Sequence, residues 1–249
     1  DLDKQLTEAG VLARRLPFQV DNTLRKAINN GEVMFIDQHL SETVEQMRNL
    51  QLKKPDVAII EAVAITEDGG IIPTTSVGNS ASFAIFAEKV IVEINTNLSP
   101  AFEGLHDIYI PTYRPTRQPI PLTQVDERIG THAINIDPAK IVGIVINNDL
   151  HDSPSTVTAP DDETQGIADH LIAFFEKEVA EERLPKNLGP LQAGIGSIAN
   201  AVLTGLKDSN FEDLVMYSEV LQDCTFELID AGKMKFASGS SITLSAKYG

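Results

Sequence analysis

The sequence predicts an α/β fold with largely parallel sheets, and three observations support this class. Continuous apolar runs typical of buried parallel strands alternate with amphipathic helical segments along the chain. Glycine, proline and aspartate punctuate these segments at the places where turns are expected. With 249 residues and 42% hydrophobic content, the chain suits one large or two medium domains and argues against wholesale disorder.

The first expected elements are helices. The stretch "DNTLRKAINN", from Asp21 to Asn30, begins with an aspartate in N-cap position and is followed by Gly31, a plausible stop. The stretch from Ser41 to Asn49 offers a serine N-cap in the same way.

Three buried strands are expected next. They are Asp56 to Ile65, Lys89 to Asn95 and Lys140 to Asn148, each a β-rich apolar run. The proline-rich stretch Ile110 to Pro121 between them is predicted to be a loop or an extended crossing segment.

A linker, "HDSPSTVTAPDDE", then separates two halves of the chain. A long amphipathic helix follows it, and its apolar face is predicted to comprise Ile167, Leu171, Phe174, Phe175 and Val179. The remaining segments alternate between helix and strand, which extends the α/β pattern to the end of the sequence.

Composition limits the possible partners. The net charge of −16 and the pI near 4.6 disfavour nucleic acid and anionic membranes, so a phosphate-bearing ligand needs a local basic or backbone site. The single cysteine, Cys224, excludes an internal disulfide and fits a reducing compartment. No apolar run is long enough to span a membrane, no targeting segment is visible, and both ends look like cuts in a longer protein.

The densest chemical signal is "GPLQAGIGSIANAVLTGL", in which Gly194, Gly196 and Ala199 have the spacing G-x-G-x-x-A. A dinucleotide fingerprint needs a strong strand before the first glycine and an acidic residue about 20 residues later. Pro190 interrupts that strand, and Glu219 meets the second condition only loosely. The alternatives are a turn at a helix N-terminus that binds an anion or stabilises an oxyanion, and a turn without a ligand.

Glu219 follows an apolar run, Leu214 to Tyr217, and so is expected at the carboxyl edge of a parallel sheet, where α/β enzymes place their chemistry. A solvent-facing glutamate is the alternative. His106 and Asp107 are adjacent and point to opposite faces of a strand, so a structural histidine is expected rather than a dyad.

Other candidate groups are scattered. The histidines have no metal-ligand spacing, so no metal is predicted; they are His39, His106, His132, His151 and His170. The turn "SVGNS", Ser76 to Ser80, is expected to be a helix cap near a domain interface rather than a second anion site. The candidate countercharges for acetate or phosphate are Arg114, Arg117 and Arg128.

The stretches "PLQAGIGSIANAVLTGL", "LVMYSEVLQDCTFELIDAGKMKFASGSSITLS", "AIIEAVAITEDGGIIPTTSVGNS" and "FEGLHDIYIP" resemble the acetyl-CoA hydrolase/transferase family of class I CoA-transferases. The likeness covers essentially the whole chain and is greatest to the fungal mitochondrial acetyl-CoA hydrolases. It implies two CoA-transferase-type α/β domains, both incomplete: residues 1–152, a linker at 153–162, and residues 163–249. It also implies that further CoA contacts come from sequence outside this chain.

Carried over by the resemblance, Glu219 is the catalytic residue, and the loop of Gln192, Ala193, Gly194, Ile195 and Gly196 binds CoA and stabilises the oxyanion. The bacterial members of the family usually read "YTEV-QDG" here, whereas this chain has Ser218 and Cys224 instead, and Cys224 is expected to be a packing residue. The implied reaction is CoA transfer between acetyl-, succinyl- or propionyl-CoA and a carboxylate such as acetate, through a glutamyl-CoA thioester and with acetyl-CoA hydrolysis as a side activity.

Coenzyme A is then a substrate and no other cofactor is expected. A homodimer is possible, and the location implied by the family is mitochondrial, with the cytoplasm as the alternative. Two other functions stay open: an NAD-dependent dehydrogenase using the G-x-G-x-x-A turn, and a non-catalytic fragment of the family.

Overall fold

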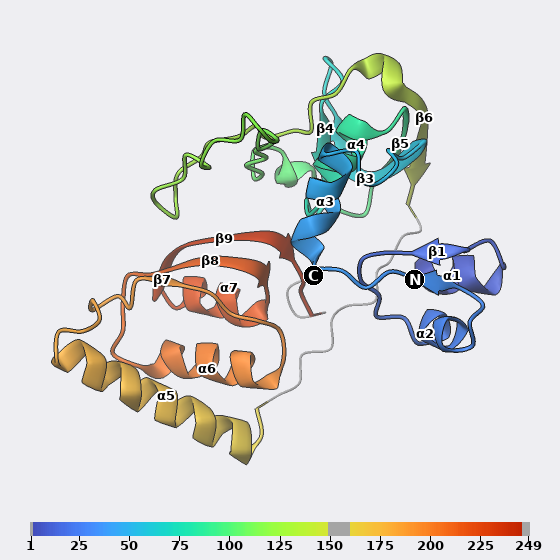
Figure 1. Cartoon of the computed structure of the whole chain (residues 1–249). Helices are drawn as coiled ribbons and strands as arrows, with labels where there is room; N and C mark the ends of the chain where they lie inside the picture. Colours follow the sequence, from blue (N-terminus) through green and yellow to red (C-terminus); the bar gives the residue numbers. More distant parts are fainter. Residues whose placement is uncertain (1, 149–159, 246–249) are drawn as a thin grey trace.

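A computed structural model describes residues 2–148 and 160–245 of the chain. Its elements form two units, each built on its own sheet, with a small N-terminal module beside the first (Figure 1). The α/β class with largely parallel sheets is therefore confirmed. The predicted linker lies outside the described residues up to residue 159, so the proposed division at 153–162 stays a prediction.

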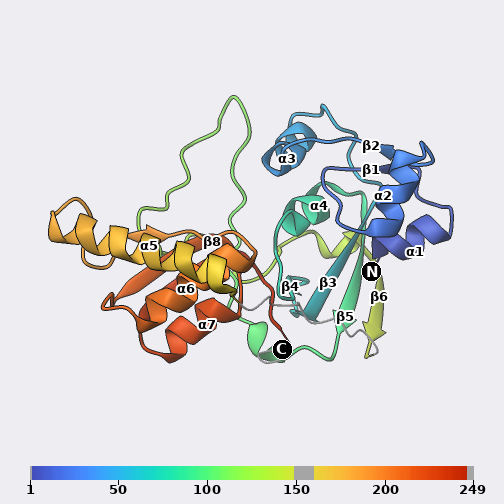
Figure 2. The ribbon, with the colours of Figure 1, turned by 90° about the horizontal axis from the view of Figure 1, so that it is seen from below.

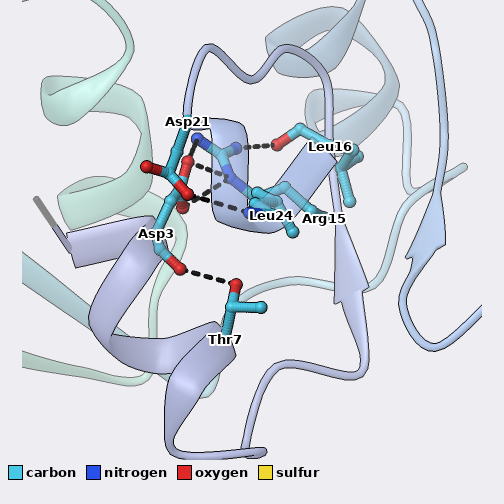
Figure 3. Close-up of polar contacts among 6 residues, drawn as sticks. All are labelled: Asp3, Thr7, Arg15, Leu16, Asp21 and Leu24. Atoms are coloured by element: carbon cyan, nitrogen blue, oxygen red, sulfur yellow. Dashed lines mark hydrogen bonds and ion pairs between the residues drawn. The ribbon is translucent and has the colours of Figure 1, made fainter. Parts of the chain in front are cut away.

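The N-terminal module pairs two helices with a two-stranded parallel sheet: α1 (Leu2–Glu8), β1 (Arg14–Arg15), α2 (Asn22–Asn29) and β2 (Met34–Phe35). The Arg15 guanidinium joins β1 to α1, with Nε 3.0 Å and Nη2 3.1 Å from the Asp3 carboxylate oxygens (Figure 3). Asp21 caps α2 by accepting a hydrogen bond from the Leu24 N–H at 2.8 Å, as the sequence predicted.

The first unit contains a four-stranded sheet in the order β4-β3-β5-β6, in which β3, β5 and β6 are parallel and β4 is antiparallel to β3. Its elements are α3 (Leu40–Arg48), β3 (Val57–Ile65), β4 (Ile71–Pro73), α4 (Ser80–Phe86), β5 (Lys89–Asn95) and β6 (Ile141–Asn147). Short 3-10 turns occupy Pro100–Phe102 and Pro138–Lys140. The alternate residues Ala58, Ile60 and Ala62 of β3 are buried in the core cluster that includes Ala81 and Ala84 of α4.

The second unit has three parallel strands in the order β7-β8-β9. Its elements are α5 (Asp162–Ala180), β7 (Pro190–Leu191), α6 (Ser197–Asp208), β8 (Leu214–Leu221), α7 (Asp223–Asp230) and β9 (Met234–Ile242). Figure 1 shows α6 and α7 on one face of this sheet, with α5 packed outside α6.

Two predictions about local structure were wrong in detail. The third helix begins at Leu40 after an N-cap at His39, so Ser41 lies inside it and instead hydrogen-bonds the His39 ring at 2.8 Å. The buried face of α5 is rotated from the predicted one. Phe175 and Val179 pack against the second core as predicted, but Ile167 and Phe174 are exposed, whereas Ala168 is fully buried and Ile172 packs against the same core.

The reason for the rotation is the surface of α6. A Cβ on Gly205 of α6 would lie 2.5 Å from Ile172 Cδ1, so the glycine leaves the space that Ile172 fills. Both stripes of α5 are apolar, and the close approach allowed by Gly205 selects the one that is buried.

The two units meet through backbone hydrogen bonds. The Ile242 N–H of β9 donates to Thr75 O at 2.8 Å, and the Val77 N–H donates to Ser240 O at 3.1 Å. The segment before α4 thus pairs with the end of β9 in an antiparallel bridge between Ser76 and Ser241. The turn "SVGNS" therefore lies at the junction of the two units, as predicted, although the Asn79 side chain at its end makes no capping hydrogen bond.

Candidate active site

Glu219 lies within β8, because this strand continues to Leu221 rather than ending at Tyr217. Its position in the sheet is exposed, while its backbone carbonyl accepts a hydrogen bond from Ser240 Oγ of β9 at 2.8 Å. The expectation of a carboxylate just past a strand was therefore wrong by a few residues. The strand itself presents this carboxylate, and the β8–β9 pairing fixes its backbone.

The predicted glycine loop connects β7 to α6. Gly196 is the N-cap of α6 with φ 122° and ψ 174°, a backbone conformation that is essentially restricted to glycine. Because glycine has no side chain to cap the helix, the first N–H groups of α6 are left to bind other acceptors. Strand β7 comprises only Pro190 and Leu191, so the long strand that a dinucleotide fingerprint requires does not precede this loop.

Ser218 joins the loop to β8. Its Oγ donates to Ala193 O at 2.9 Å, and the Ala193 N–H approaches the same Oγ at 3.3 Å. The residue before Glu219 in the chain therefore ties β8 to the glycine loop at Ala193.

A cleft of about 850 Å³ lies between the two units. Gln192 and Glu219 line it from the second unit, and the other four loop residues are not among its walls. The first unit contributes Gly78 and Asn79 of the turn before α4, and the segments 105–111 and 127–129. The proline-rich segment predicted to be a loop projects from the first unit over β8 and β9 (Figures 1 and 2) and adds Ile120 to the lining.

The predicted countercharges are already engaged. Arg114 Nε and Arg117 Nη1 lie 3.3 and 3.6 Å from the Glu45 carboxylate. Arg128 borders the cleft, but its guanidinium donates to the carbonyl oxygens of Gly104, Leu105 and His106. All three arginines thus have structural partners in the chain.

His106 and Asp107 have separate structural roles, as predicted. His106 Nε2 donates to Pro73 O at 2.8 Å, and burial lowers the pKa of the imidazole. Asp107 accepts hydrogen bonds from the Ile129 and Gly130 N–H groups.

Cys224 is buried in the core of the second unit, where burial raises the pKa of its thiol to about 11. This agrees with a packing role, because a neutral thiol is a poor nucleophile. Within the described residues, no group of three or more His, Cys, Asp or Glu side chains is arranged to hold a metal ion. No helix in that same part of the chain is both long and apolar enough to cross a membrane.

Sequence reasoning missed Arg48, the last residue of α3, whose side chain borders the cleft beside Ser82. An arginine in the last turn of a helix is common, because it interacts favourably with the helix dipole, so the sequence offered no signal. Ser218 and Ser240 were missed for a similar reason: each acts through a backbone partner on another strand or loop.

The fold is that of the CoA-transferases. The 4-hydroxybutyrate CoA-transferase of Porphyromonas gingivalis superposes with a TM-score of 0.60 over 98% of this chain and 55% of that one, at 18% identity. RipA from Yersinia pestis superposes with a TM-score of 0.57 over 92% of this chain and 51% of that one, at 17% identity.

The chain belongs to the acetyl-CoA hydrolase/transferase family, since residues 1–146 match the model of the family's N-terminal domain. It is 46% identical over 98% of its length to the succinyl-CoA:acetate CoA-transferase of Clostridium kluyveri, and 45% identical over 98% to the acetyl-CoA hydrolase of Schizosaccharomyces pombe. It spans 45% and 48% of these two relatives.

Proposed function

We propose that the protein transfers coenzyme A between an acyl-CoA and a small carboxylate such as acetate, with Glu219 as the covalent nucleophile. The observation that supports this most directly is the position of Glu219, exposed on β8 and lining the cleft together with Gln192. The names of the relatives, a succinyl-CoA:acetate CoA-transferase and acetyl-CoA hydrolases, are consistent with transfer and with hydrolysis.

In the first half-reaction, the Glu219 carboxylate attacks the thioester carbonyl of the acyl-CoA. The C–S bond breaks, so an acyl-glutamyl anhydride forms and the CoA thiolate is released. The thiolate then attacks the glutamyl carbonyl of the anhydride, which gives a glutamyl-CoA thioester and frees the first carboxylate.

The second half-reaction reverses these steps with a different acid. Acetate attacks the glutamyl thioester to form a second anhydride and CoA thiolate. The thiolate attacks the acetyl carbonyl, so acetyl-CoA leaves and the Glu219 carboxylate is restored. A carboxylate suits this chemistry because the substrate acids and Glu219 form the same two kinds of bond, an anhydride and a thioester, so each step is reversible. The two separate half-reactions predict ping-pong kinetics.

The glycine loop has an electrostatic role in this proposal. Each attack places negative charge on a carbonyl oxygen. We assign the stabilisation of that charge to backbone N–H groups near Ile195 at the start of α6, although Gln192 is the one member of the five-residue loop that lines the cleft in this structure. Water that reaches the anhydride or the thioester releases the acid and free CoA instead, so the exclusion of water sets the ratio of transfer to hydrolysis.

The test is to trap the thioester in the complete natural polypeptide. The protein is incubated with succinyl-CoA, reduced with borohydride and digested, and the mass of the peptide containing Glu219 is measured. We expect the Glu219 carboxyl to be converted to a hydroxymethyl group, whereas Glu219→Gln shows no conversion and loses turnover by on the order of a thousandfold or more.

Glu212→Gln is a matched control, because Glu212 is an exposed glutamate two residues before the same strand. It should keep both the trapped product and the turnover. Turnover of CoA esters with an unmodified Glu219 would exclude the covalent route and favour direct attack by water. The absence of both trapping and turnover would favour a non-catalytic binding role.

A further inference from the structure

Several arginines of this chain have their donors well satisfied. Arg15 makes a two-pronged contact with Asp3 and donates from Nη1 to Leu16 O at 2.6 Å (Figure 3). Arg183 pairs with both Glu178 and Glu181. These pairings show how the fold provides partners for guanidinium groups that it orders.

Arg48 differs from this pattern. Its Nε is buried and has no hydrogen-bond partner within the described part of the chain, and its Nη2 makes one long contact, 3.4 Å from Ser82 Oγ. No carboxylate of the described residues forms an ion pair with it. A partly buried guanidinium with one weak hydrogen bond and no ion pair is unfavourable, and a partner from outside the chain that reaches its Nη atoms would stabilise it.

The surroundings of Arg48 indicate the kind of partner. The side chain borders the cleft together with Gly78, Asn79 and Ser82, which offer polar groups but no charge to balance it. The nearest carboxylate that acts on it, that of Glu45, is already shared by two other arginines. Burial lowers the pKa of the Arg48 guanidinium, with Glu45 opposing this shift and Arg117 adding to it.

We propose that Arg48 is the anion-binding residue of this cleft and takes a carboxylate or phosphate group of the substrate. The planar guanidinium carries two Nη nitrogens, whose donors can bind two oxygens of one such group at once. This inference rests on the proposed function, because it assigns part of the same cleft to the anionic end of that substrate. On a chain with a net charge of −16, a local cation is required to hold an anion there.

Direct binding tests the proposal without depending on turnover. Calorimetric titrations with acetate, inorganic phosphate and coenzyme A are compared for the unaltered protein, Arg48→Gln and Arg48→Lys. We expect Arg48→Gln to weaken at least one of these affinities by about tenfold or more. Arg48→Lys should restore part of the loss, because lysine keeps the positive charge but lacks the planar pair of donors of a guanidinium. Acetate as the affected probe indicates a carboxylate site, and phosphate or coenzyme A indicates a phosphate site.

Arg14→Gln is a charge-matched control, since Arg14 is exposed on β1 and does not line the cleft. A charge outside the cleft acts on the bound anion only through screened long-range interactions. Arg14→Gln should therefore change each affinity by less than about threefold. A measurement without any variant covers the case in which Arg48→Gln does not fold. Phenylglyoxal labels Arg48 and Arg14 in the unaltered protein, and the bound probe should protect Arg48 only.

The proposal is overturned if none of the three probes binds the unaltered protein, or if Arg48→Gln is folded and binds them all equally well. Failure of the proposed function gives a different result. In that case anions still bind through Arg48 while no reduced glutamyl product forms at Glu219.

Discussion

The two units each place a glycine turn before a helix, and the two turns are held in different ways. In the first unit, the turn at Gly78 follows a segment that is hydrogen-bonded through its backbone to β9, at Thr75 O and Val77 N. In the second unit, the loop that leads to the turn at Gly196 is hydrogen-bonded to β8 through the side chain of Ser218, which contacts the Ala193 backbone.

The helices that follow the turns differ as well. Helix α4 has seven residues and α6 has twelve, so the dipole and the free N–H groups at the start of α6 are better developed. Glycine spacing alone therefore does not predict what the backbone around a turn contacts. The segment at the first turn joins the two units through its backbone, whereas the second turn connects β7 to α6 and only Gln192 of its five predicted binding residues lines the cleft.

Substitution of the two glycines should give the largest contrast in stability. Gly196→Ala is expected to destabilise the protein by up to about 3 kcal/mol, because φ 122° with ψ 174° excludes side chains, although space for a Cβ exists. Gly78→Ala should cost only about 1 kcal/mol, because φ +43° is close to the left-handed region that other residues can adopt. Urea unfolding of both variants measures the difference, and equal losses would contradict the contrast.

The pH dependence of the free energy of unfolding should distinguish a buried group of the second unit, Cys224, from one of the first unit, His106. The fold favours the neutral thiol of Cys224 in the second unit, whose pKa rises from 9.0 to about 11, so stability should fall by about 2 kcal/mol as pH rises through that interval. The fold favours neutral His106 in the first unit, whose pKa is lowered from 6.5, so this contribution is present above pH 6.5 and is lost as the pH falls.

Urea unfolding between pH 5 and 11 measures both effects. Cys224→Ala should flatten the alkaline side and leave the acid side unchanged, and His106→Gln should do the reverse. A Cys224→Ala variant with an unaltered alkaline slope would mean that other groups dominate that titration.

Removal of the Ser218 hydroxyl should have the smallest effect on stability and should act on the second turn only. Ser218→Ala loses the hydrogen bonds with Ala193, which corresponds to about 1 kcal/mol. Hydrogen exchange of the Ala193 N–H should become faster, while that of the Val77 N–H stays unchanged. Ser218→Thr keeps the hydroxyl and should restore the slow exchange; failure to do so would show that the hydroxyl does not fix the loop.

Local sequence patterns predicted the α/β class, the positions of β3, β5 and β6 and the helix at α2. These features depend on apolar runs of strand length and on an aspartate N-cap, whereas the catalytic role of Glu219 and the binding role of the glycine loop stay predictions. The family likeness also resides in contiguous motifs, so it could be read without coordinates.

Long-range packing brought together groups that no local pattern in the sequence relates. It placed Gly78 of the first unit and Glu219 of the second on one cleft, and it selected the face of α5 through the space left by Gly205. It also assigned Arg114 and Arg117 to Glu45 while leaving Arg48 beside the cleft. A charged side chain pairs with a group that the fold brings within a few ångströms of it. The local periodicity of the sequence does not encode distances between residues far apart in the chain, so these pairings could not be predicted from it.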